Sequence, residues 1–223
     1  MIYQEKKYES IRYLQRLPKF YIEGTKLPTI LFLHGAGTVG TDIEVLKNNS
    51  FFVSTDKPDC PFAVVAPLCE QGVWFDVFEQ LKAFAEAVSE MQFVDQDRLY
   101  LIGNSMGGYG AWQLAMSLPH LFAALVPVCG GGMAWRTKQL KNVPIWAFHG
   151  QLDDTVFVDE SIHMVDETNR HGGNARLTIF PNADHNSWDP TYATEELWLW
   201  LLSQKRKKSS TVIQERMDPT IYG

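Results

Sequence analysis

A single serine stands among four glycines in the stretch LYLIGNSMGGYGAWQLAM, residues 99–116. The pentapeptide at residues 103–107 reads G-x-S-x-G, with Ser105 at its centre. An apolar run precedes it and a helical pattern follows, which predicts a tight strand-to-helix turn that presents the serine. Glycines two residues before and two after remove Cβ atoms that would collide in such a turn. The pattern therefore indicates a nucleophile, and a serine that merely caps the helix is the alternative.

A serine nucleophile needs a general base, and the chain has six histidines. His185, in FPNADHNSW, lies in a loop just after the last β-rich run, from which it can reach Ser105. It is the base that we predict. His34 and His149 each end a β-rich run in the dipeptide HG, and His120 lies at a helix-to-strand corner. His163 falls inside a predicted helix and His171 at its end.

The base in turn needs an acid to orient it. The stretch FHGQLDDTVF supplies two neighbouring carboxylates, Asp153 and Asp154, just after a β-rich run. Adjacent side chains point in different directions, so we expect one to face the histidine and the other to cap the following helix. The spacing leaves open which is which.

These candidates all follow β-rich runs that alternate with helical patterns. The runs are residues 29–34, 62–67, 98–103, 122–129, 144–150 and 176–181, and the helical patterns are residues 77–88, 108–118, 157–171 and 191–204. Most of the runs are continuously apolar, which is typical of strands covered on both faces. Strands that alternate with helices imply crossover connections, so the sequence predicts an α/β fold, a parallel sheet with helices on both faces. Ligands bind at the carboxyl ends of such strands.

Composition narrows the classes of function. With 223 residues and 45% hydrophobic content, the chain is expected to form one domain at residues 1–208. A polar tail at residues 209–223 would dock on that domain or on a neighbouring copy, which leaves a homo-oligomer open. The net charge of −6 argues against a nucleic-acid or anionic-membrane partner.

Targeting and cofactor signals are sparse in the sequence. We find no secretory signal and no apolar stretch of the roughly twenty residues that a bilayer span needs. The three cysteines lack C-x-x-C spacing, which together with those absences predicts a cytoplasmic protein. The glycines match neither the order G-x-G-x-x-G nor a Walker loop, and no clustered metal-ligand set is visible, so we expect no metal or organic cofactor.

Several segments together resemble the α/β-hydrolase superfamily in order and spacing: LFLHGAG, VVAPLC…W, VDQDRLYLIGNSMGGYGAW, FHGQLDD and DHNSW…Y. The resemblance is strongest to small serine esterases, which include feruloyl-esterase-like proteins, polyhydroxybutyrate-depolymerase-like "predicted peptidases" and the phospholipase/carboxylesterase group. It extends from about residue 29 to residue 204. It implies an α/β-hydrolase fold with a mostly parallel central sheet.

The resemblance also implies a role for individual residues. Ser105 would be the nucleophile, His185 the general base and Asp153 the orienting acid, because residues 149–156 match H-G-x-x-D-x-x-V. The backbone N–H groups of Ala36 and Met106 would form the oxyanion hole.

The surroundings of the site bear on substrate choice. Trp74, Trp135 and Trp188 follow β-rich runs near one sheet edge; each alone fits core packing, whereas as a group they would line a binding cleft. Between residues 129 and 144 there is room for a loop and a short helix but not for a cap domain. An open cleft of this kind favours short acyl or aryl esters.

We therefore interpret the sequence as that of a serine hydrolase that cleaves carboxylic esters of small molecules through an acyl-enzyme. A serine peptidase, a thioesterase or an acyltransferase would use the same three residues. A non-catalytic binding module that kept the fold is the alternative from another class, and it predicts a missing member of the triad, whereas all three members are present.

Overall fold

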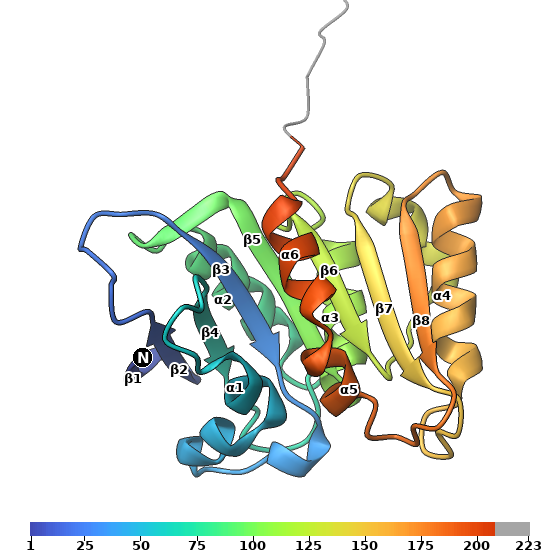
Figure 1. The fold of residues 1–223 in the computed structure, drawn as a ribbon, viewed down its shortest axis with the longest axis horizontal. Coiled ribbons are helices and arrows are strands. Elements are labelled where there is room, and N and C mark those ends of the chain that lie inside the picture. The colour runs from blue at the N-terminus through green and yellow to red at the C-terminus, as the bar shows by residue number, and fades with distance from the viewer. Residues whose placement is uncertain (208–223) are drawn as a thin grey trace, which may run out of the picture.

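A single eight-stranded sheet forms the centre of the computed structural model, which describes residues 1–207 (Figure 1). The strands are β1 (Ile2–Tyr8), β2 (Ile11–Leu17), β3 (Leu27–Leu33), β4 (Ala63–Pro67), β5 (Val94–Asn104), β6 (Ala124–Val128), β7 (Ile145–Gly150) and β8 (Ala175–Phe180). Their order is β1-β2-β4-β3-β5-β6-β7-β8. All pairs from β4 to β8 are parallel, and only β1–β2 and β2–β4 are antiparallel. The predicted α/β fold with a mostly parallel sheet is confirmed.

Helices cover both faces of this sheet. They are α1 (Ser50–Thr55), α2 (Phe78–Ser89), α3 (Met106–Ser117), α4 (Val158–Arg170), α5 (Trp188–Ala193) and α6 (Glu195–Ser203), with short 3₁₀ helices η1 (Ala36–Thr38), η2 (Ile43–Asn48) and η3 (Ala134–Leu140). In Figure 1, α1, α5 and α6 lie in front of the sheet, whereas α2 and α3 lie behind it. Among residues 1–207, no helix is long and apolar enough to cross a bilayer.

Each face of the sheet has its own hydrophobic core. Along β5, Leu99 and Leu101 belong to the core under α2, α3 and α4, whereas Tyr100 and Ile102 belong to the core under α1, α5 and α6. Successive side chains of a strand point to opposite faces, so a strand covered on both sides must be apolar at every position. This requirement explains the continuously apolar runs.

The amino-terminal hairpin of β1 and β2 is a strand pair that we did not predict. Strand β1 reads IYQEKKY and is mostly exposed at the edge of the sheet, where charged side chains discourage pairing with other chains. The helix predicted at residues 191–204 is two helices, because Thr194 between α5 and α6 has an extended backbone with ψ of 101°. The tail predicted at residues 209–223 lies outside the described residues.

Close packing at the turn from β5 to α3 depends on two glycines. A Cβ on Gly103 would lie 2.1 Å from the carbonyl oxygen of Gly107, and a Cβ on Gly107 would lie 2.0 Å from the carbonyl oxygen of Leu33 in β3. Real Cβ atoms do not come this close to backbone atoms, so no other residue fits either position without moving the chain. Ser105 between them has a φ of +52°, a conformation that is rare for a residue with a side chain.

We predict that Gly107→Ala destabilises the protein by about 3 kcal/mol, because the new methyl group meets rigid backbone rather than a mobile side chain. Gly37→Ala is the matched control, since a Cβ there has nothing within 4 Å. Urea unfolding of both variants measures the difference. Equal midpoints for the two variants would contradict the close-packing argument.

Candidate active site

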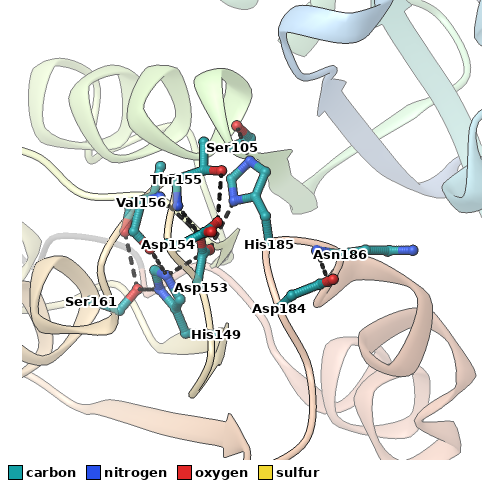
Figure 2. A network of polar contacts seen from close by, with 11 residues as sticks. Ser105, His149, Asp153, Asp154, Thr155, Val156, Ser161, Asp184, His185 and Asn186 are labelled. Carbon is teal, nitrogen blue, oxygen red and sulfur yellow. Dashed lines mark hydrogen bonds and ion pairs between the residues drawn. The ribbon is translucent and has the colours of Figure 1, made fainter.

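Ser105, His185 and Asp153 form a continuous hydrogen-bonded chain at the carboxyl edge of the sheet (Figure 2). They come from the turn after β5, the loop after β8 and the loop after β7. Nε2 of His185 lies 2.9 Å from Oγ of Ser105, and Nδ1 lies 2.8 Å from Oδ2 of Asp153. Because a carboxylate only accepts, Nδ1 carries the proton and Nε2 is free to accept the serine proton. This arrangement can activate a hydroxyl for nucleophilic attack.

The Asp153 carboxylate is buried but well supplied with donors. Its Oδ1 accepts the backbone N–H groups of Thr155 at 3.0 Å and Val156 at 2.8 Å. Burial by itself raises the pKa of this carboxyl, but the hydrogen bonds from His185, Val156 and Thr155 outweigh it and hold the pKa below its usual value. Asp153 therefore stays ionised and can stabilise a positive charge on His185.

Asp154, the neighbour that sequence spacing left open, points elsewhere. It is exposed, and its Oδ1 is 3.4 Å from the hydroxyl of Thr155. The expectation that it caps the following helix is wrong: α4 begins after Phe157 and has no side-chain cap. Asp153 instead bonds the turn before α4 with one oxygen and His185 with the other.

Two backbone N–H groups lie beside Ser105. Met106 is the first residue of α3 and Ala36 is the first residue of η1, so neither N–H has a carbonyl partner inside its own helix. The loop with Ala36 packs on the turn with Ser105, since a Cβ on Gly35 would lie 3.5 Å from the Ser105 Cβ. Ala36 and Ser105 line the same cleft, and the oxyanion hole at Ala36 and Met106 stays a prediction.

His34 fastens the loop that contains Ala36. Its Nδ1 donates to the carbonyl of Gly35 at 2.8 Å, and its Nε2 accepts the N–H of Cys69 at 3.0 Å. Burial lowers the pKa of His34 to about 4, so the ring stays neutral and keeps both bonds. Trp74 adds a bond from Nε1 to the His34 carbonyl at 3.0 Å.

The three candidate tryptophans do not share one cleft. Trp74 is only 1% exposed and packs on the His34 ring, so its prediction as a cleft residue is corrected to a core residue that supports the loop. Trp135 lies on η3 with 71% of its surface exposed and does not line the cleft beside Ser105, which corrects the second prediction. Trp188 does line that cleft, with its ring edge-on to His185 at 5.4 Å between centroids.

The cleft beside Ser105 has a volume of about 430 Å³; its lining has no charged side chain, and more of its exposed surface is apolar than polar. Besides Ser105, His185 and Trp188, it is lined by Gly35, Ala36, Gly37, Thr38, Asn48, Asn49, Ser50, Asn104 and Thr155. We did not predict Asn48, Asn49 and Ser50, because they come from a segment of short helices between β3 and β4 that has no clear periodicity.

A buried hydrogen bond connects Asn104 to α5. The hydroxyl of Tyr192 donates to its Oδ1, and both side chains are buried. Burial raises the pKa of Tyr192 well above its usual value, so the hydroxyl remains a donor. The bond joins the helix after the His185 loop to the turn that carries Ser105.

A group of possible metal ligands that we did not predict lies at the triad. Cys129, Asp153 and His185 follow three different strands, yet their ligand atoms lie within 4.8 Å of one another. Burial raises the pKa of the Cys129 thiol to about 12, which favours the neutral thiol over the thiolate that metals bind. His185 and Asp153 are already bonded to each other, so the group is better suited to proton transfer.

Comparisons with known proteins were consistent with this geometry. A model of the dienelactone hydrolase family matches residues 18–196. No curated protein matches the sequence.

Similar solved structures include esterases and a peptidase. A thermostable esterase has 30% identity and a TM-score of 0.76 over 92% of this chain; the match covers 63% of that esterase, so this chain spans less than two thirds of its length. Est1E from Butyrivibrio proteoclasticus has 15% identity and a TM-score of 0.70, with 90% of this chain and 98% of that chain covered. An acylaminoacyl peptidase from Pyrococcus horikoshii has 15% identity and a TM-score of 0.68, with 93% of this chain and 42% of that chain covered. The last two likenesses show the fold alone.

The neighbouring carboxylates allow a matched test of the site. Asp153→Asn is expected to lower kcat on an activated ester by about 10⁴-fold, because an amide can favour the wrong tautomer of His185. Asp154→Asn makes the same chemical change one residue away, at an exposed side chain, and should leave kcat within about threefold. Steady-state kinetics on both variants checks the ranking. The reverse ranking would assign the acid to Asp154.

Proposed function

We propose that this chain, which belongs to the dienelactone hydrolase family within the α/β-hydrolase superfamily, is a serine hydrolase. Its proposed substrates are carboxylic esters with short acyl or aryl groups. The observation that carries the proposal is the hydrogen-bonded chain from Ser105 through His185 to Asp153. The 30% identity to a thermostable esterase supports the same chemistry.

The proposed reaction begins with acylation. Oγ of Ser105 attacks the ester carbonyl while Nε2 of His185 takes its proton, and Asp153 stabilises the imidazolium that forms. The carbonyl oxygen becomes an oxyanion, which the N–H groups of Met106 and Ala36 would bind, each contributing about 3 kcal/mol. The imidazolium then protonates the departing alcohol and leaves an acyl group on Ser105.

Deacylation follows the same route with water. His185 takes a proton from water, which attacks the acyl-enzyme, and then returns the proton to Oγ of Ser105. These side chains and backbone N–H groups supply every proton transfer and the stabilisation of the oxyanion, so the proposed mechanism includes no cofactor.

The cleft supports a small, uncharged substrate. Its lining has no lysine or arginine to pair with a substrate carboxylate, and its apolar side chains are Ala36 and Trp188. The segment between β6 and β7, residues 129–144, holds only the short helix η3, so nothing there forms a tunnel over Ser105. A neutral ester with a short acyl group fits this surface best.

We further propose that the protein acts as a cytoplasmic enzyme. Cys60, Cys69 and Cys129 are buried and form no disulfide, which suits a reducing compartment. The acidic net charge of −6 supports a small-molecule substrate rather than a nucleic acid.

The test of the proposed function is labelling of Ser105. A fluorophosphonate probe is expected to label the folded wild type at Ser105, and Ser105→Ala should lose both the label and about four to six orders of magnitude of ester turnover. Circular dichroism of the variant controls for folding. An unlabelled, folded wild type would favour a binding module, and faster turnover of amides or thioesters than of esters would move the proposal to a peptidase or thioesterase.

Chain length of the acyl group gives a second test. In a series of p-nitrophenyl esters, we predict the highest kcat/KM from acetate to butyrate and a decline beyond about octanoate. A buried tunnel would instead add about 0.8 kcal/mol per methylene and raise kcat/KM steeply with length. We also expect no activation by a lipid interface. An optimum at dodecanoate or longer would contradict the short-acyl proposal.

A further inference from the structure

The last residue but one of β7, His149, lies beside the Asp153 carboxylate. Both side chains are completely buried, and Figure 2 shows the His149 ring next to the carboxylate. Nε2 of His149 is 3.2 Å from Oδ2 of Asp153, the same oxygen that accepts the N–H of His185 at 2.8 Å. The carboxylate therefore sits between two imidazole rings. The sequence had placed His149 only at the end of a β-rich run, in the dipeptide HG.

The neighbours of Nε2 decide where His149 carries a proton. Nε2 also lies 2.8 Å from the carbonyl oxygen of Val156. A carbonyl and a carboxylate oxygen can only accept, so Nε2 must carry a proton to avoid facing two lone pairs. Nδ1, on the other side of the ring, is 2.7 Å from the hydroxyl of Ser161, which can donate or accept. The Nε2–H thus donates to the Val156 carbonyl, and the Asp153 carboxylate lies next to it, 3.2 Å from Nε2.

The ring itself is firmly held. Ser161 belongs to α4 and is completely buried, and its Oγ also lies 3.0 Å from the carbonyl oxygen of Gly130, just after β6. Through Ser161 and Val156, His149 joins the end of β7 to α4, to the loop that contains Asp153 and to the segment after β6. A ring held at both nitrogens offers a donor at a fixed position.

We propose that His149 is a positioning residue of the triad, whose Nε2–H fixes the carbonyl of Val156 and lies beside Oδ2 of Asp153. The N–H of Val156 in turn donates to Oδ1 of Asp153, so the ring holds the turn that orients the carboxylate toward His185. His185 gains and loses a proton in every cycle, whereas His149 takes no part in proton transfer and keeps its bond to Val156 throughout. The inference rests on the proposed function, because it concerns the acid of that reaction.

Two substitutions at His149 distinguish the effect of losing the N–H donor from the effect of losing the ring. His149→Phe keeps a buried ring without a donor, whereas His149→Gln places an amide N–H near the position of Nε2. Per active site counted with the phosphonate probe, we expect His149→Phe to lower kcat by about 10- to 100-fold with little change in KM, since a misplaced catalytic group weakens the transition state more than the bound substrate. His149→Gln should recover most of the loss.

A buried hydroxyl on the same helix supplies the control. Thr168 is completely buried in α4, and its Oγ1 donates to the carbonyl of Met164, away from the triad. Thr168→Val should leave kcat per active site unchanged. An unchanged kcat per site in His149→Phe, or no recovery in His149→Gln, would show that His149 is only structural and would overturn the proposal.

The proton on Nε2 can be observed without substrate or variants that fold poorly. In wild-type protein labelled with [¹⁵N]histidine, a long-range ¹H–¹⁵N spectrum distinguishes protonated from unprotonated ring nitrogens, and the His149→Gln spectrum assigns the signal. We expect Nε2 of His149 to be protonated at pH 7, and an unprotonated Nε2 would overturn the proposal. A wild type that neither hydrolyses esters nor reacts with the phosphonate would instead refute the proposed function, and this spectrum would still decide the position of the proton.

Discussion

The contact between the turn at Ser105 and the neighbouring strands is the constraint on which the site depends. At Gly103 and Gly107 the backbones of β3, β5 and α3 approach so closely that a Cβ would lie within about 2 Å of a carbonyl oxygen. Behind them, a Cβ on Gly108 would lie 2.8 Å from the carbonyl oxygen of Val128 in β6. This packing lets Ser105 adopt its rare φ directly before the first N–H of α3.

Burial then separates the charge states of the groups around that turn. It raises the pKa values of Cys129 and Tyr192 and lowers that of His34, so all three remain neutral and act as hydrogen-bonding groups. The Asp153 carboxyl is the exception, because N–H donors surround it and hold its pKa down. A fixed negative charge behind His185, in surroundings of neutral dipoles, is what stabilisation of an imidazolium requires.

The surface in front of the triad has a different origin. Its polar side chains, Asn48, Asn49 and Ser50, come from the short helices between β3 and β4, whereas Trp188 comes from the start of α5. The segment with Asn48, Asn49 and Ser50 contributes nothing to the hydrogen-bonded chain from Ser105 to Asp153, so this part of the proposed substrate surface can vary without disturbing it, whereas Trp188 packs on His185. The scaffold and the specificity of the site are therefore separable parts of the structure.

Local patterns in the sequence were enough to determine the parallel sheet and the turn at Ser105, because each follows from residues close together in the chain. His185 was chosen by its place in the loop after the last β-rich run, although the serine that it contacts is 80 residues away. Continuously apolar runs identify strands covered on both faces, and paired glycines identify a turn with no room for Cβ atoms. Tertiary structure alone decided between Asp153 and Asp154, which have the same side chain in the same local context and differ only in the direction they point. It also placed Trp74 in the core, because that outcome depends on packing against His34, which is distant in the sequence. The pairing of β1 with β2 and the contact of His149 with the carboxylate join residues that are close in the chain. They were missed because β1 is mostly exposed and charged, and because spacing does not tell which way a side chain points.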